Sequence, residues 1–124
     1  MAEGAQILVV EDNEKNMKLF RDVLGATGYR TLEATTGGEA IDLASEHTPD
    51  LVLMDIQLPD LDGVQTLRRL RADARTATIP VLALTAQAMR GDRERFLAAG
   101  FDDYLSKPVD ILDFVATVQR YCGS

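Results

Sequence analysis

The chain has 124 residues, of which 46% are hydrophobic and 27% charged, values typical of one soluble globular domain. Its 13 basic and 20 acidic residues give a net charge of −7, which argues against nucleic acid and anionic membranes as partners. A single cysteine, Cys122, excludes an intramolecular disulfide, and neither a signal peptide nor a membrane-spanning apolar run is visible. We therefore expect a cytoplasmic protein.

The first half of the chain alternates between strand and helix patterns. Gln6–Glu11 is a nearly continuous apolar run, which is typical of a strand buried on both faces of a sheet. Helical spacing then follows in Met17, Phe20, Val23 and Leu24. After the stop signal Gly28, Tyr29–Ala34 alternates and predicts a second strand nearer an edge. A helix should begin at Gly37 and end before Pro49.

The second half repeats this alternation three times. Leu51–Met54, Pro80–Thr85 and Asp103–Ser106 predict strands, and Pro80 stands at a first position, where a missing N–H is tolerated. A helix should follow each strand, and the middle one should stop at Gly100. The apolar positions of these helices are Val64, Leu67 and Leu70, then Met89, Phe96 and Leu97, and finally Ile111, Phe114, Val115, Val118 and Tyr121.

Five β-α units in a row predict an α/β fold, in which a doubly wound parallel sheet is covered by helices on both faces. Ligand sites in such folds lie beyond the carboxyl ends of the strands, where the strand order switches. The residues at the strand ends are therefore the best candidates for function.

Polar groups follow four of the five predicted strands. They are Glu11 and Asp12, then Asp55, then Thr85, and last Ser106 with Lys107 and Pro108. Carboxylates that converge at one edge repel each other unless a cation is present, and oxygen ligands of this kind suit Mg²⁺. A carboxylate held at the end of a rigid strand, beside a metal ion and a lysine, can act as a nucleophile towards a phosphoryl group. Asp12 or Asn13 could instead be only a helix cap.

The combined motifs resemble the receiver domain of two-component response regulators, of the CheY-like superfamily. The matching stretches are VVEDN (9–13), LVLMDIQLPDLDG (51–63), LTA (84–86) and GFDDYLSKPV (100–109). The resemblance covers essentially all of residues 1–124 and implies a flavodoxin-like sheet of order 2-1-3-4-5 with five helices. Further detail in NEKNMKLF (13–20) and LTAQAMRGDRE (84–94) is similar both to stand-alone receivers of cell-division phosphorelays and to receiver modules of hybrid histidine kinases.

The resemblance also implies a role for each site residue. Asp55 would accept a phosphoryl group, Asp12 and Asp55 would bind Mg²⁺ directly, and Glu11 would bind it through water. The backbone carbonyl of Gln57 would be a further metal ligand. Lys107, placed by a cis peptide bond to proline, would pair with the phosphoryl group.

Switching is implied as well. Thr85 would hydrogen-bond the phosphoryl oxygen and move towards it, and Tyr104 would turn inward in response. The surface of the fourth helix, fifth strand and fifth helix would then bind a downstream protein target. The phosphodonor would be a histidine kinase or a histidine phosphotransfer protein. We expect a monomer or weak dimer without an output domain, and an activity limited to its own phosphorylation and dephosphorylation.

Three alternatives compete with this interpretation. Haloacid-dehalogenase-like phosphatases also use an aspartate nucleophile, but they need a second acid where this chain has Gln57. A flavodoxin-like cofactor binder should offer hydroxyl or glycine donors after the first strand, where EDNEKN offers mostly acids. A degenerate receiver would act through protein contacts alone, although all of the expected site residues are present.

Simpler roles are expected for several other polar residues. His47, the only histidine, should be exposed at a helix end, and Cys122 should be a helix-end residue. The remaining expectations are turn formation by Asp60, Asp62 and Gly63, solvent-facing charge at Asp102 and Asp103, and a solvated helix face at Arg68, Arg69 and Arg71. Gln57 and Gln87 occupy positions that tune the lifetime of the aspartyl phosphate in the family.

Overall fold

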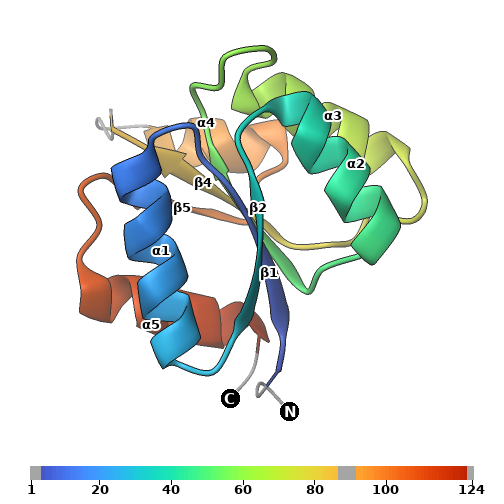
Figure 1. Cartoon of the computed structure of the whole chain (residues 1–124). Coiled ribbons are helices and arrows are strands. Elements are labelled where there is room, and N and C mark those ends of the chain that lie inside the picture. The colour runs from blue at the N-terminus through green and yellow to red at the C-terminus, as the bar shows by residue number, and fades with distance from the viewer. Residues whose placement is uncertain (1–3, 87–91, 123–124) are drawn as a thin grey trace.

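Strands and helices alternate along the chain in the computed structural model, which describes residues 4–86 and 92–122 (Figure 1). The elements are β1 (Gln6–Val10), α1 (Glu14–Ala26), β2 (Arg30–Ala34), α2 (Gly37–His47), β3 (Leu51–Asp55), α3 (Gly63–Ala72), β4 (Val81–Thr85), α4 (Asp92–Ala99), β5 (Asp103–Ser106) and α5 (Ile111–Cys122). Their types and order agree with the sequence prediction. Met89, which was expected on the fourth helix, and Gln87 lie outside the described residues.

The strands form a parallel sheet in the order β2-β1-β3-β4-β5, as the family resemblance implied. The chain leaves β1 for β2 on one side and later returns to place β3 on the other side of β1. The strand order therefore switches between β1 and β3, and a ligand site is expected beyond their carboxyl ends. β2 is an edge strand, as its alternating sequence predicted.

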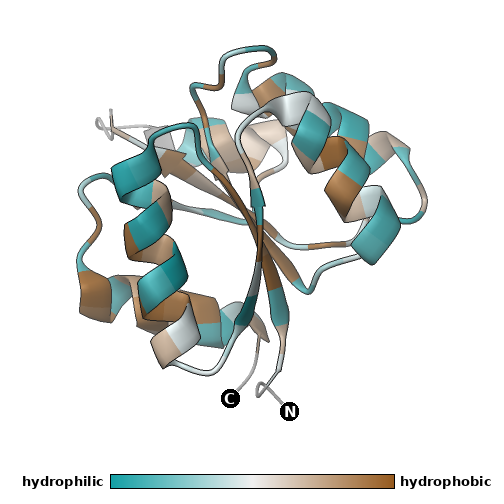
Figure 2. Ribbon diagram, in the orientation of Figure 1, coloured by the Kyte–Doolittle hydropathy of each residue, from teal (hydrophilic) through white to brown (hydrophobic). Residues whose placement is uncertain are grey.

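Helices cover both faces of the sheet and create two separate cores. α1 and α5 pack on one face, where the rings of Phe20 and Phe114 stack with their centroids 5.3 Å apart. α2, α3 and α4 pack on the other face, over residues such as Leu67 and Phe96. Figure 2 shows that the central strands are mostly hydrophobic, whereas hydrophilic and hydrophobic residues alternate along the helices. Burial on both faces explains why β1, β3 and β4 are nearly continuous apolar runs.

The observed boundaries differ from the predicted ones by a single residue at several strand ends. β3 includes Asp55 itself, because Asp55 still pairs with Leu84 of β4 in the ladder. Tyr29 and Pro80 precede their strands rather than beginning them. Asp55 is therefore held by sheet hydrogen bonding and is more rigid than a loop residue would be.

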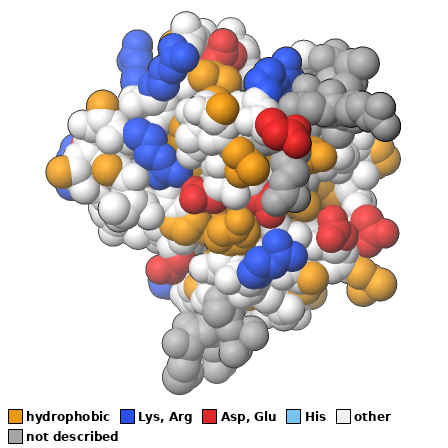
Figure 3. Space-filling model, turned by 180° about the vertical axis from the view of Figure 1, so that it is seen from behind, with side chains coloured by type: hydrophobic (Ala, Val, Ile, Leu, Met, Phe, Trp, Pro, Cys, Tyr) orange, Lys and Arg blue, Asp and Glu red, His pale blue; other side chains and the backbone are white. Residues whose placement is uncertain are grey.

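The expectation of a solvated helix face is wrong for one of the three arginines of α3. Arg68 and Arg69 are exposed, as expected, and Lys and Arg side chains are visible at the surface in the region of α3 and α4 (Figure 3). Arg71, however, is turned inward: its guanidinium donates to the carbonyls of Ala77 at 3.0 Å and Ile79 at 2.5 Å, and to the Asp102 carboxylate at 3.0 Å. Asp102 is exposed, as expected, with 40% of its side chain open to solvent, and it also serves as an acceptor for Arg71.

The other simple assignments agree better with the structure. His47 is exposed in the last turn of α2, and Cys122 is half-buried at the end of α5. For Asp103, in contrast, the expectation of a solvent-facing charge is wrong, because only 14% of its side chain is exposed and it pairs with Arg120 at 3.5 Å. Across the described residues, no helix has both the length and the apolar character that a membrane span requires.

Candidate functional site

The carboxyl ends of β1, β3 and β4 bring the predicted acidic residues together. Val10 pairs with Met54 and Asp55 pairs with Leu84, so the residues that follow β1 lie level with the end of β3. One carboxylate oxygen each from Glu11, Asp12 and Asp55 lies within 4.8 Å of the others. The sequence prediction that these acids converge at one sheet edge is thus correct.

The three acids differ in exposure. Glu11 and Asp55 are buried, with 1% and 7% of their surface exposed, whereas Asp12 is open to solvent. Asp12 does not cap α1: the neighbouring Asn13 does so, and its side chain accepts a hydrogen bond from the Asn16 backbone N–H. The capping alternative is therefore right for Asn13 and wrong for Asp12, whose carboxylate is available at the mouth of the site.

Lys107 bridges the two buried acids. Its Nζ donates to Glu11 Oε1 at 2.5 Å and to Asp55 Oδ2 at 2.9 Å, and 15% of its side chain is exposed. The peptide bond from Lys107 to Pro108 is cis, as predicted. The Lys107 backbone N–H also donates to the Thr85 carbonyl at 2.8 Å, so β4 and the loop after β5 are tied together at the site.

Burial and charge shift the pKa values of this group. Burial is the main cause that raises the pKa of Glu11 above its ordinary value, and the nearby Asp55 carboxylate adds to the rise. For Lys107, burial acts to lower the pKa, but hydrogen bonds to Glu11 and Asp55 outweigh it and the net shift is upward. The lysine is therefore cationic at neutral pH, and the acids compete for it.

The backbone around Asp55 is closely packed. The Gln57 N–H donates to Asp55 Oδ1 at 2.9 Å, while Lys107 takes Oδ2, so both carboxylate oxygens have a hydrogen-bond donor. A Cβ at Gly63 would lie 2.9 Å from the Cα of Ile56 and 3.0 Å from the Asp55 carbonyl oxygen. Only glycine fits at position 63 without displacing the backbone beside the site.

Comparison with known proteins assigns the chain to a family. A model described as the response regulator receiver domain matches residues 7–119. The chain belongs to the response regulator receiver family. This assignment to a signalling family decides against the phosphatase and flavodoxin alternatives.

Individual relatives of this receiver cover nearly the whole chain. The polar-differentiation response regulator DivK of Brucella ovis is 50% identical over 117 residues, which are 94% of this chain and 95% of DivK. This similarity agrees with the expected resemblance to cell-division phosphorelay receivers.

Solved structures agree as well. The receiver domain of the sensor histidine kinase PA1611 from Pseudomonas aeruginosa, solved with magnesium in its active-site cleft, is 40% identical with a TM-score of 0.89, covering 98% of this chain and 99% of that one. The receiver domain of Ssk1 from Saccharomyces cerevisiae, solved with the histidine phosphotransfer protein Ypd1, is 27% identical with a TM-score of 0.86, covering 96% of this chain and 89% of the matched chain.

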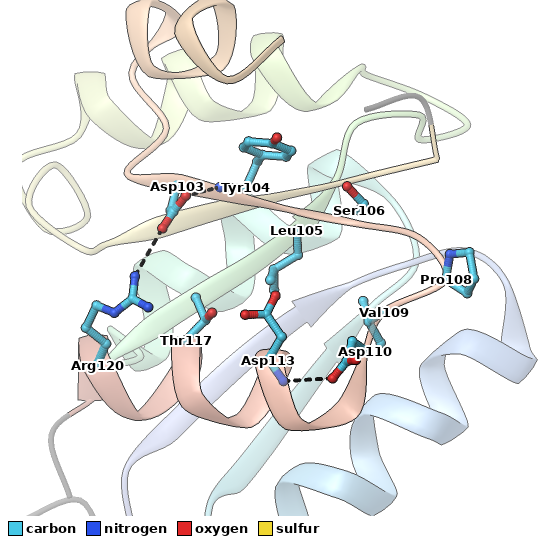
Figure 4. A pocket seen from close by; sticks show the side chains of 10 residues that line it. All are labelled: Asp103, Tyr104, Leu105, Ser106, Pro108, Val109, Asp110, Asp113, Thr117 and Arg120. Atoms are coloured by element: carbon cyan, nitrogen blue, oxygen red, sulfur yellow. Dashed lines mark hydrogen bonds and ion pairs between the residues drawn. The ribbon is translucent and has the colours of Figure 1, made fainter. Parts of the chain in front are cut away.

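The two predicted switch residues of the receiver lie on neighbouring strands. Thr85 is buried at the end of β4, and it lines the same hollow as the three acids and Lys107. Tyr104 of β5 is half-buried, and its ring centroid lies 5.8 Å from that of Phe96 on α4. Figure 4 shows Tyr104 on the side of β5 away from α5, opposite to Leu105. Tyr104 therefore contacts α4, the helix that follows the strand ending in Thr85.

The donor set of the receiver fits Mg²⁺. Three carboxylates lie close together, two of them buried, and hard oxygen ligands of this kind are the ones that Mg²⁺ takes in proteins. Three carboxylates gather around one lysine ammonium, so the cluster carries more negative charge than Lys107 alone neutralises. Such a site gains stability from an added cation.

Two residues near the site were missed by sequence reasoning. The Asn16 side chain lies 3.5 Å from Glu11 Oε1 as a donor, and Arg95 of α4 lines the same hollow as Asp55 and Thr85. Asn16 follows the Asn13 cap by three positions, so helical spacing could have placed it over the site. Arg95 could have been found by noting that α4 follows β4 directly.

Proposed function

We propose that this receiver accepts a phosphoryl group on Asp55 from a phosphohistidine, in a reaction that needs Mg²⁺. The observation that supports this most is the placement of Asp55: a buried carboxylate at the end of β3 that shares Lys107 with Glu11 and lies within 4.8 Å of the acidic cluster. A purely structural ion pair would not need a third carboxylate at an exposed position.

The proposed chemistry is a displacement at phosphorus. An Asp55 carboxylate oxygen attacks, the new O–P bond forms as the P–N bond to the donor imidazole breaks, and the electron pair of that bond goes to the imidazole nitrogen. Asp55 is oriented by the hydrogen bonds from the Gln57 N–H and from Lys107, which limit the carboxylate to a narrow range of positions.

Charge compensation would come from both the protein and the metal ion. Asp12 and Asp55 would bind Mg²⁺ directly, with Glu11 through water and the Gln57 backbone carbonyl as a further ligand. The bound ion would neutralise phosphoryl oxygens as charge develops on them. Lys107, already 2.9 Å from Asp55 Oδ2, would pair with the transferred group, and the Thr85 hydroxyl would donate to it.

Signalling would follow from the new charge at Asp55. Thr85 would move towards the phosphoryl group, Tyr104 would turn inward, and the α4–β5–α5 surface would change its affinity for a downstream protein. The tilted contact between Tyr104 and Phe96 of α4 supports this coupling, because movement of either element disturbs that contact. Mutations at Gln57 and Gln87 would change the lifetime of the aspartyl phosphate.

The phosphodonor would be a histidine kinase or a histidine phosphotransfer protein in the cytoplasm. The similarity to a yeast receiver solved with the phosphotransfer protein Ypd1 supports the second type of donor. The chain would catalyse only its own phosphorylation and dephosphorylation, with no turnover of small phosphate esters.

Intact mass after incubation with acetyl phosphate tests this proposal. Wild type should gain the mass of one phosphoryl group with Mg²⁺ and none after chelation. Asp55→Asn should gain nothing, whereas Asp42→Asn, which alters an exposed acid on α2, should behave as wild type. Wild type that gains no mass, yet binds beryllofluoride, would have the site without the transfer activity. An adduct retained in Asp55→Asn would place the acceptor elsewhere.

A further inference from the structure

Asp60 links the loop after β3 to the beginning of α2. Its Oδ1 accepts a hydrogen bond from the Gly37 N–H at 2.7 Å, and its Oδ2 accepts one from the Gly38 N–H at 2.9 Å. These hydrogen bonds, the one from Gly38 first, hold the pKa of Asp60 below its ordinary value. The expectation that Asp60 only shapes a local turn is therefore wrong.

The contact between this loop and α2 leaves no room for a side chain at position 37. A Cβ on Gly37 would lie 2.4 Å from Thr66 Oγ1 and 3.0 Å from the Leu61 Cβ. Thr66 Oγ1 in turn donates to the Asp62 carbonyl at 2.9 Å. The loop is thus packed between the first turns of α2 and α3, and the Asp60 carboxylate is its polar connection to α2.

The same loop begins at the proposed phosphorylation site. The Gly63 N–H donates to the Ile56 carbonyl at 2.8 Å, which closes the segment 56–63 into a compact loop. Gln57 lies in this segment, and its N–H holds Asp55 Oδ1. A shift of the loop away from α2 would therefore move the backbone of Gln57, whose carbonyl is a proposed metal ligand.

α2 has its own capping groups, so Asp60 is not needed simply to begin the helix. The Thr36 side chain accepts from the Glu39 N–H at 3.1 Å, and the Glu39 carboxylate accepts from the Thr35 N–H at 2.8 Å. Asp60 is exposed and Gly38 is half-buried, so water can replace the carboxylate at the Gly38 N–H when Asp60 is removed. The contribution of Asp60 to the stability of α2 can thus be separated from its role in attaching the loop 56–63 to that helix.

We propose that Asp60 is a positioning residue: by holding the loop 56–63 against α2 it keeps the Gln57 backbone beside Asp55, and so sets the affinity of the site for Mg²⁺. The expected effect on Mg²⁺ affinity rests on the metal site of the proposed function. Groups that orient metal ligands from outside the first coordination shell change affinity by about 10- to 100-fold when removed. The lower end of that range applies to Asp60, because it acts on a single backbone ligand.

Calorimetric titration with MgCl₂ tests the proposal in wild type, Asp60→Ala and Thr36→Ala. Asp60→Ala should bind Mg²⁺ roughly tenfold more weakly. Thr36→Ala removes the side-chain cap of α2 without touching the loop, so its affinity should stay within about twofold of wild type. Because Asp60 also carries charge, the titration is repeated at about 0.5 M NaCl, where long-range attraction is screened and the difference should persist.

Amide hydrogen exchange of Gln57, read by NMR without metal, provides a second test that does not depend on Mg²⁺ binding. Exchange should be faster in Asp60→Ala and unchanged in Thr36→Ala, because only the first variant frees the loop. Equal Mg²⁺ affinity in wild type and Asp60→Ala, or equal weakening in both variants, would overturn the proposal. Wild type that binds no Mg²⁺ would count against the metal site of the proposed function, and the Gln57 exchange rates would then decide the positioning role alone.

Discussion

The ion pairs at the two ends of the sheet differ in the ratio of acidic to basic groups. At the carboxyl end, Glu11 and Asp55 share Lys107, and Asp12 adds a third carboxylate to the group. The acids therefore exceed the cation that they contact. Burial makes the ionised form of Glu11 unfavourable, which is the main reason why its pKa is raised.

At the amino end, donors and acceptors are matched. The Arg71 guanidinium, at the end of α3, donates to backbone carbonyls and to the Asp102 carboxylate. The Asp102 Oδ2 also accepts from the Val81 N–H at 2.8 Å, where β4 begins. This network pairs one arginine with one aspartate, whereas the carboxyl-end cluster places three carboxylates around one lysine. The excess of acid at the carboxyl end is thus a property of the functional site.

Removing Arg71 should have the largest effect on stability. Arg71→Ala removes the donor to the carbonyls of Ala77, Ile79 and Gly100 and leaves Asp102 with the Val81 N–H but no arginine, so we expect the free energy of unfolding to fall by roughly 2–3 kcal/mol. Arg69→Ala, which alters an exposed arginine on the same helix, should change it by less than about 0.5 kcal/mol. Urea unfolding followed by circular dichroism measures both. Similar losses in the two variants would show that the amino-end network is not structural.

Removing Lys107 at the carboxyl end should lower the free energy of unfolding somewhat less than removing Arg71 does, by an amount that depends on pH. Lys107→Met leaves Glu11 and Asp55 without their shared cation, and we expect a loss of about 1–2 kcal/mol at pH 8 without Mg²⁺. The raised pKa of Lys107 means that its stabilisation is fully present at pH 8 and is lost only as pH rises through the folded-state value.

At pH 5 the loss in Lys107→Met should be smaller, because Glu11 can then take up a proton and relieve the unpaired charge. The exposed Lys18→Met serves as a control, since 70% of the Lys18 side chain is exposed. A loss in Lys107→Met that grows as the pH falls would contradict this description of the site.

Replacing Glu11 should have a smaller effect on the free energy of unfolding, and the direction of its pH dependence can be stated. Its pKa is raised in the folded state, so the folded protein binds that proton more tightly than the unfolded chain does. Stability should therefore decline as pH rises from about 4.3 through the folded-state pKa. The free energies of unfolding of wild type and Glu11→Gln should be compared with a metal chelator present. As the pH rises, Glu11→Gln should become more stable relative to wild type. A difference that is flat over this range would mean that Glu11 carries no such penalty.

The smallest effect concerns Cys122, at the amino end. Burial raises the pKa of its thiol to about 11, with a further contribution from Asp50. The thiol should stay protonated at pH 8, so alkylation by iodoacetamide should be slower in the folded protein than in urea. Equal rates would show that the end of α5 opens readily and that this part of the amino end is not well packed.

The sequence predicted the arrangement of the fold for physical reasons that can be named. β3 and β4 are buried on both faces, so their apolar runs are unbroken and easy to find. The acids at the strand ends could be placed together because parallel strands bring their carboxyl ends to one edge. The cis bond before Pro108 followed only from the family resemblance.

Long-range polar contacts could not be predicted in this way. Helical spacing places Arg71 on α3, but it says nothing of the Ile79 and Gly100 carbonyls that fold back around the guanidinium. Asp60 looks like a turn residue because its partners, Gly37 and Gly38, lie 23 and 22 positions earlier. Such contacts depend on the packing of whole elements, which local patterns do not contain.

Urea unfolding with and without Mg²⁺, for wild type and Asp12→Asn, asks whether the clustered acids form a cation site, with Asp42→Asn as control. If the excess of acid is a cation site, Mg²⁺ at about 100 times its dissociation constant should stabilise wild type and the control by about 2.7 kcal/mol. Asp12→Asn should be at least as stable as wild type without Mg²⁺ and should lose most of the gain. No stabilisation of wild type by Mg²⁺, or an equal gain in Asp12→Asn, would show that the clustered acids are not a cation site.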